Sequence, residues 1–220
     1  KISKFLEDAD LTKLNNSKLK DILNLLLERN DVSHKELFNA FKFLYRDELI
    51  TNLEKLDSDF SGLNLIINNK VIINALRKII FCDFKLEATL TKTRKNLCDR
   101  IAKNIDNINY SELKFIIALG EQCFLNEYVY ALTESEKSSL NIIIRKCIDG
   151  ELNEKNISIL SCYFPLDKLI DQIPTLNTFS SSNQFFSELI KLQILEPLKE
   201  IKLSQNIKKI GSINDDVSQK

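Results

Sequence analysis

The chain has 220 residues, and its 31 basic and 31 acidic side chains leave a formal net charge of zero at pH 7. A neutral chain lacks the long-range field that attracts a protein to nucleic acid or to acidic lipid, so neither partner is predicted. No apolar run approaches the roughly 20 residues of a transmembrane helix, so the sequence predicts no membrane span.

Glycine and proline are scarce, with only 4 and 3 copies in the chain. Sandwiches, barrels and glycine-rich phosphate loops need many tight turns, and those turns consume both residue types. The composition therefore predicts an all-α fold, an irregular bundle of about eight to ten helices. No helix-pair repeat is evident, so a regular solenoid is not predicted.

Residues 1–60 are predicted to form a small N-terminal helical unit. Apolar residues at helical spacing indicate helices over 18–29, 34–45 and 47–56, with Ser17 and Ser33 as N-caps. Asp57-Ser58-Asp59 then interrupts the pattern. His34 is interpreted as an exposed residue near a helix cap, because the adjacent Ser33 is assigned to the cap and no other Ser or Cys nucleophile is evident nearby.

Residues 61–204 are predicted to form the main helical domain. The expected helices cover 69–80, 84–104, 112–131, 134–149, 153–161, 166–170 and 185–195. Asp83, Ser111 and Thr133 are the expected N-caps, Gly150 is an expected helix stop, and Pro197 is expected to end or bend the last helix. Residues 205–220 lose the apolar periodicity and are interpreted as a linker toward a further domain.

The helix expected over 84–104 carries five cations, which we place on its outer, solvated face. They are Lys92, Arg94, Lys95, Arg100 and Lys103. A nucleic-acid surface is the other interpretation of such a row, but no aromatic residues alternate with these cations to stack on bases.

Five cysteines contain no C-x-x-C pair, and one is left over from any pairing: Cys82, Cys98, Cys123, Cys147 and Cys162. This pattern predicts free thiols in the core and a reducing compartment, the cytoplasm. The motifs that carry phosphate binding, metal hydrolysis or acyl transfer are missing from the sequence. We therefore assign no catalytic, cofactor-binding or metal residue to this chain.

The segment from Glu121 to Tyr130 places amides and a carboxylate among apolar residues. Gln122, Asn126, Glu127 and Tyr130 are candidates for a structural network or for contact with another domain, because a buried polar group without a partner costs about 1 to 3 kcal/mol. Their helix carries apolar residues on several sides, so we expect it at the centre of the fold, with Cys123 and Phe124 buried. Gly120 indicates close approach of another backbone.

This segment is one of several motifs through which most of the chain resembles a known family. The motifs that carry the resemblance are 27–34 (LERNDVSH), 43–45 (FLY), 81–87 (FCDFKLE), 121–130 (EQCFLNEYVY), 163–166 (YFPL), 196–198 (EPL) and 213–218 (INDDVS). In this order they resemble a bacterial family in which tetratricopeptide repeats come first, a helical region follows, and a class I S-adenosylmethionine-dependent methyltransferase domain comes last.

The resemblance implies a non-catalytic helical region that positions or regulates the methyltransferase domain. S-adenosylmethionine would then be the cofactor of the parent protein only, since the glycine-rich cofactor loop of that family has no counterpart in this chain. Tyr163, in the YFPL motif, joins the candidate domain-contact residues. The partner would be an adjacent domain or another protein. Two alternatives remain: a stand-alone helical protein-interaction module and an all-helical enzyme of another kind.

Overall fold

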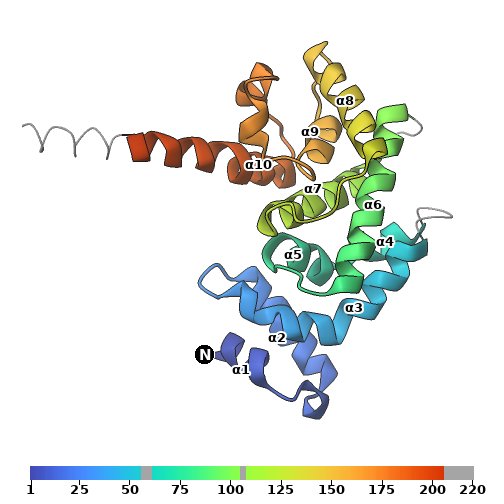
Figure 1. The fold of residues 1–220 in the computed structure, drawn as a ribbon. Helices are drawn as coiled ribbons and strands as arrows, with labels where there is room; N and C mark the ends of the chain where they lie inside the picture. Colours follow the sequence, from blue (N-terminus) through green and yellow to red (C-terminus); the bar gives the residue numbers. More distant parts are fainter. Residues whose placement is uncertain (56–60, 105–107, 206–220) are drawn as a thin grey trace, which may run out of the picture.

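The computed structural model describes residues 1–55, 61–104 and 108–205, all of whose regular structure is helical (Figure 1). Helices α1 to α10 lie in this part of the chain, and it contains no β-strand. The predicted all-α fold of eight to ten helices is confirmed. The predicted linker lies outside the described residues apart from Gln205.

The first half of the fold contains α1 (Ile2–Asp8), α2 (Asn16–Glu28), α3 (Phe38–Glu54), α4 (Ser61–Asn68) and α5 (Lys70–Lys78). The prediction of two helices over 34–45 and 47–56 is wrong, because α3 is one helix and no Gly or Pro interrupts it. Ser33 precedes a 3-10 turn and its side chain makes no cap hydrogen bond. Asn15, rather than Ser17, caps α2.

The second half contains α6 (Phe84–Lys103), α7 (Tyr110–Leu125), α8 (Glu134–Ile148), α9 (Glu154–Leu160) and α10 (Gln184–Ile190). Asp83 and Thr133 cap α6 and α8 as predicted, whereas Asn109 replaces Ser111 at the start of α7. Helix α10 continues through a π-helical turn, Lys191–Leu195, into helix 196–205. We call residues 184–205 the C-terminal arm.

Pro197 does not end the arm, contrary to one of the two expected outcomes. A proline inside a helix lacks an N–H and its ring collides with the carbonyl four residues earlier. The wide π-turn lies directly before Pro197, and there the Glu196 N–H bonds to the Lys191 carbonyl, five residues back. The widened turn changes the local backbone where the collision would arise, and the helix continues.

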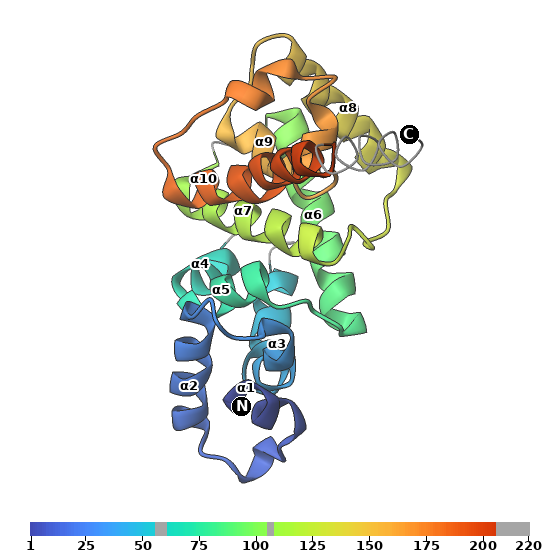
Figure 2. The same ribbon diagram turned by 90° about the vertical axis from the view of Figure 1, so that its left-hand side faces the viewer.

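Helix α7 lies at the centre of the fold, as predicted. It packs against α4, α5, α9 and α10, and five consecutive apolar residues, Phe115 to Leu119, are fully buried. Figures 1 and 2 show α7 crossing between α1–α5 on one side and α8–α10 on the other. Helix α3 packs on α6, and α4 and α5 pack on α7, so the core is continuous across the two halves.

Asp83 joins α3 to the start of α6. Its carboxylate caps α6 at Leu86 N (3.1 Å) and accepts from Lys42 Nζ and Arg46 Nε, both at 2.9 Å. Burial alone would raise the pKa of the Asp83 carboxyl, but the hydrogen bonds from Arg46, Lys42 and the Leu86 N–H outweigh it. The pKa therefore lies well below its ordinary value of 3.8.

A carboxyl pKa that is lowered by folding stabilises the native state above the unfolded pKa, and this stability is lost as pH falls through the folded pKa. We expect Asp83→Asn to lower the free energy of unfolding by about 2 kcal/mol at pH 7, with a difference from wild type that shrinks below about pH 4. Urea unfolding between pH 3 and pH 7 measures this. A difference that does not change with pH would contradict the ion-pair account.

Candidate functional site

A buried polar cluster surrounds the Arg94 guanidinium, which is 2% exposed. Arg94 Nη2 donates to the Ala131 carbonyl at 2.7 Å and to Glu136 Oε1 at 3.2 Å. The guanidinium carbon lies 4.2 Å from the centre of the Tyr163 ring and 5.7 Å from that of Tyr130. Helix α6 thus holds α8, the α7–α8 connection and the turn after α9 through one side chain.

The prediction that Arg94 lies on the outer face of α6 is wrong. It follows Leu90 by four residues and precedes Leu97 by three, which places it within the buried apolar stripe of the helix. That spacing could have identified it in the sequence. Lys92 and Lys103 are exposed as expected, while Lys95 and Arg100 are half-buried.

Glu136 completes the cluster and is fully buried. Its carboxylate forms a capping box with Thr133, the expected N-cap, and also accepts from the Tyr163 hydroxyl at 2.8 Å. Burial alone would raise the pKa of the Glu136 carboxyl, but the Thr133, Tyr163 and Arg94 donors outweigh it and hold the pKa below 4.5. Burial raises the pKa of the Tyr163 phenol, so Tyr163 keeps its proton and donates a hydrogen bond to Glu136.

The candidate residues separate into three groups. Tyr130 and Tyr163 meet at Arg94. Gln122 and Asn126 are buried at the end of α7, and both amides lack a hydrogen-bond partner among the described protein atoms. Glu127 is exposed. Asn126 nevertheless lies close enough to the Tyr130 hydroxyl to oppose the rise that burial causes in the pKa of Tyr130. The structural network for Gln122 and Asn126 therefore stays a prediction.

Helix α7 ends at Leu125, six residues before its predicted end at 131. The Glu127 N–H bonds to the Phe124 carbonyl at 3.1 Å and the Tyr128 N–H to the Cys123 carbonyl at 2.9 Å. This is the Schellman pattern of helix termination. Phe124 lies against Tyr128 and is half-buried, so the prediction that it is a core residue is wrong.

Glu127 occupies the position at which a Schellman motif favours glycine. Its φ is 56° and that of Tyr128 is 59°, in the left-handed region that costs an ordinary residue about 1–2 kcal/mol. Helix α8 ends in the same pattern, with Gly150 at the equivalent position and φ 102°. The chain therefore contains one Schellman motif with glycine at the left-handed position and one with glutamate there.

Glu127→Gly is expected to raise the free energy of unfolding by about 1 kcal/mol, because it removes the left-handed strain of an exposed residue. Gly150→Ala is the matched control and should lower the free energy of unfolding by about 1 kcal/mol. No atom lies within 4 Å of the added methyl group, so the cost comes only from placing alanine at a positive φ. Thermal and urea unfolding of both variants measure the pair. Destabilisation by Glu127→Gly would mean that the Glu127 side chain contributes more than the backbone strain costs.

A shallow apolar groove of about 520 Å³ lies beside this helix end. Its lining residues are Phe124, Leu125, Glu127, Tyr128 and Pro165. The Schellman turn forms one wall, and Pro165, which precedes the 3-10 turn Leu166–Leu169, belongs to another segment. Arg94 holds the Ala131 carbonyl, and so fixes the α7–α8 connection that follows the Schellman turn.

The C-terminal arm is rooted next to the groove by Gln193, which is fully buried. Gln193 Nε2 donates to the Gly120 carbonyl at 3.1 Å, and its Oε1 accepts from the Tyr128 hydroxyl at 3.4 Å. Sequence reasoning missed this residue. The signal was its position between Leu189 and Ile194 on the apolar side of the helix, four residues after the first and one before the second.

A second contact fixes the arm to α5 and α7. Arg77 pairs with the buried Glu121 and, at 2.5 Å, with Glu188 of the arm. Its guanidinium carbon also lies 4.5 Å from the centre of the Phe185 ring, over which Lys114 Nζ lies at 4.7 Å. The first two turns of the arm are therefore held to the body at several points.

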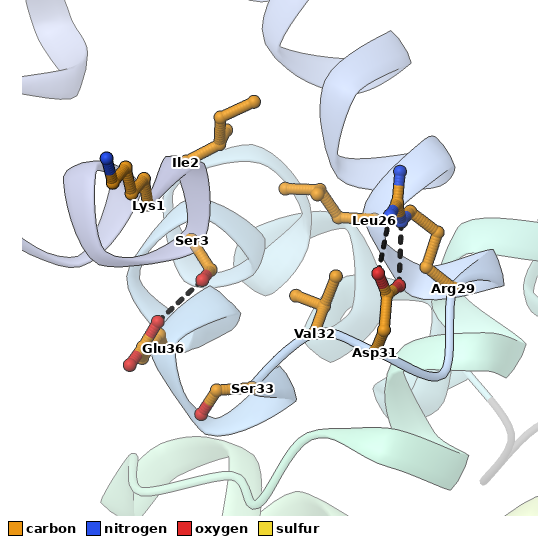
Figure 3. Close-up of a pocket in the computed structure, with 9 residues that line it drawn as sticks. All are labelled: Lys1, Ile2, Ser3, Leu26, Arg29, Asp31, Val32, Ser33 and Glu36. Carbon is orange, nitrogen blue, oxygen red and sulfur yellow. Dashed lines mark hydrogen bonds and ion pairs between the residues drawn. The ribbon is translucent and has the colours of Figure 1, made fainter.

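An open groove of about 510 Å³ lies at the N-terminal end, between α1, α2 and the turn before α3 (Figure 3). Its two carboxylates already have partners, because Glu36 accepts from Ser3 Oγ at 2.6 Å and Asp31 pairs with Arg29 at 2.5 Å. His34 Nε2 lies 2.9 Å from the Arg29 carbonyl, and the ring is half-buried rather than exposed as we expected. This groove presents no unpaired carboxylate for chemistry.

All five cysteines are free thiols, and Cys82 alone is exposed. Within residues 1–55, 61–104 and 108–205, no three His, Cys, Asp or Glu side chains gather as metal ligands would. None of the helices in these ranges is both long and apolar enough to cross a membrane. The chain matches no protein-family model, and no curated protein or solved structure is significantly similar to it.

Proposed function

We propose that this chain is a non-catalytic helical region whose C-terminal arm holds an adjacent domain of the same polypeptide in a fixed orientation. The main support is the contrast between the two ends of the arm. Its root is locked by the buried Gln193 and by Arg77, whereas residues 199–205 are exposed along their whole length (Figures 1 and 2). A helix fixed at one end transmits the orientation of the body to whatever is attached to the other.

The family resemblance suggests the identity of the adjacent domain. It supports a class I methyltransferase domain, with S-adenosylmethionine as the cofactor of that domain and not of this chain. The helical region would then position or regulate the methyltransferase, and the Gln122–Tyr130 segment would contribute by anchoring the arm, since Tyr128 bonds to Gln193.

The arm proposal is tested by backbone ¹⁵N relaxation of residues 196–205. We expect them to tumble with the body in the wild type and to gain independent motion in Gln193→Ala, because the variant removes the hydrogen bonds at the root. Lys199→Ala, at an exposed position on the same arm that makes no contact with the root, is the control and should change nothing. An arm that moves independently in the wild type would refute the proposal.

The second candidate is a stand-alone helical protein-interaction module, favoured by the apolar groove beside α7. The coding sequence beyond Lys220 discriminates the two functions. A predicted strand followed by a glycine-rich turn supports the methyltransferase-associated region, whereas an immediate stop codon supports the module.

We expect this chain to bind no S-adenosylmethionine, because the class I fold binds it through a glycine-rich strand-to-helix turn that this sequence lacks. Calorimetric titration with S-adenosylmethionine measures this. Saturable binding at micromolar cofactor would instead favour an all-helical enzyme.

A further inference from the structure

The groove and the outer half of the arm have complementary surfaces. The groove is apolar, and the Glu127 carboxylate on its rim forms no ion pair with the described residues. The outer half of the arm exposes two large aliphatic side chains, Ile201 and Leu203, at 40% and 53%. Lys202 stands between them, is exposed, and has no ion-pair partner in the described part of the chain.

These two surfaces cannot meet within one molecule. Gln193 and Tyr128 fix the root of the arm beside its own groove, and the arm then runs out past the end of α7 (Figures 1 and 2). At 1.5 Å per residue, helix 196–205 places its far end roughly 15 Å beyond the root. A groove can therefore receive an arm only from another molecule.

We propose that two copies of this chain pair through their arms, which lie antiparallel so that the far end of each reaches the groove of the other. Such a two-fold arrangement makes each contact twice, as closed homodimers do. Lys202 of one copy then lies near Glu127 of the other, and Ile201 contacts the apolar wall. The pairing goes beyond the proposed function, because it requires no adjacent domain and uses the part of the arm that the body leaves uncovered.

Within a single chain, apolar side chains continue from the buried face of the arm onto its exposed part. Ile194, Leu198 and Ile201 follow one another by four and three residues, the spacing of a coiled-coil seam. Ile194 is buried against the body, Leu198 is half-buried, and Ile201 is exposed. An antiparallel second arm extends this apolar contact over the part of the helix that the body does not cover.

The first test is the oligomeric state, measured by sedimentation velocity from about 2 to 200 µM. We expect a concentration-dependent dimer in the wild type and a monomer throughout for Ile201→Glu. Leu25→Glu, at a leucine on α2 that is more exposed still (58%), is the control and should dimerise as the wild type does. Both positions are on the surface, and circular dichroism verifies that the variants keep the fold.

The second test is charge reversal. Glu127→Lys and Lys202→Glu should each weaken dimerisation by about tenfold or more, and the double variant should recover most of that loss. Glu127→Lys keeps a non-glycine residue at the left-handed position, so the backbone cost stays the same. A wild-type monomer at 200 µM, a dimer insensitive to Ile201→Glu, or a double variant without recovery would each overturn the proposed pairing.

Discussion

Replacing Arg94 by methionine is expected to lower the free energy of unfolding by about 3–5 kcal/mol, a large share of the roughly 5–15 kcal/mol of a typical domain. The guanidinium is the buried partner of Glu136 and of the Ala131 carbonyl, and it stacks on Tyr163. Methionine fills much of the volume but leaves the Glu136 carboxylate in a buried site without its counter-charge. Urea unfolding measures the loss.

Two further variants identify its cause. Arg94→Met/Glu136→Gln removes both charges, so it should be less destabilised than the sum of the two single variants. Lys92→Met, on the exposed side of the same helix, should change the free energy of unfolding by less than about 1 kcal/mol. Additive losses in the double variant would mean that Arg94 acts through packing and not through its pairing with Glu136.

Features of the fold set by local chemistry could be predicted from the sequence. The scarcity of glycine and proline indicated helices, and the caps at Asp83 and Thr133 follow from a side chain and a backbone only three residues apart. Where two polar residues stand close together before a helix, the sequence does not decide which of them is the N-cap. Asn15 and Asn109 were preferred over Ser17 and Ser111, and sequence spacing gives no means of ranking them.

The end of α7 was mispredicted because tertiary contacts determine it. Residues 126–131 continue a helical pattern, yet two of them are left-handed, while Arg94 holds the Ala131 carbonyl and Gln193 holds Tyr128. Neither partner is near in sequence. The pattern within this segment alone predicts a longer helix, whereas contacts from α6 and the C-terminal arm hold residues 128–131 in another conformation.

The sequence identified the central helix but not the buried side chains around it. The apolar residues on several sides of α7 correctly indicated a central helix. Tyr130 and Tyr163 each contact Arg94. The side chain that unites them, Arg94, was assigned to the surface because its charge was given more weight than its place in the apolar stripe. The same error concealed Gln193. Both residues are polar, occupy buried helical positions and form hydrogen bonds to other segments.

Gly120 of α7 lies in close contact with Ser161 at the end of α9, and Gly120→Ala is expected to cost about 2–3 kcal/mol of unfolding free energy. A Cβ at Gly120 would overlap Ser161 Oγ and lie 3.2 Å from Ser161 Cβ. Gln193 donates to the carbonyls of both residues, at 3.1 and 3.5 Å, so a separation of the two helices also strains the root of the arm.

The close approach itself is tested by exchanging the two side chains. Ser161→Gly alone should cost about 1 kcal/mol, because glycine loosens the end of α9. In Gly120→Ala/Ser161→Gly the new methyl group occupies space that the serine has vacated, so the double variant should be more stable than Gly120→Ala alone. Urea unfolding of the four proteins gives the coupling between the two sites. If the new methyl group destabilises the protein by colliding with Ser161, removing the serine side chain relieves the collision and the two substitutions are coupled. A coupling near zero would mean that Gly120 serves the fold in some other way.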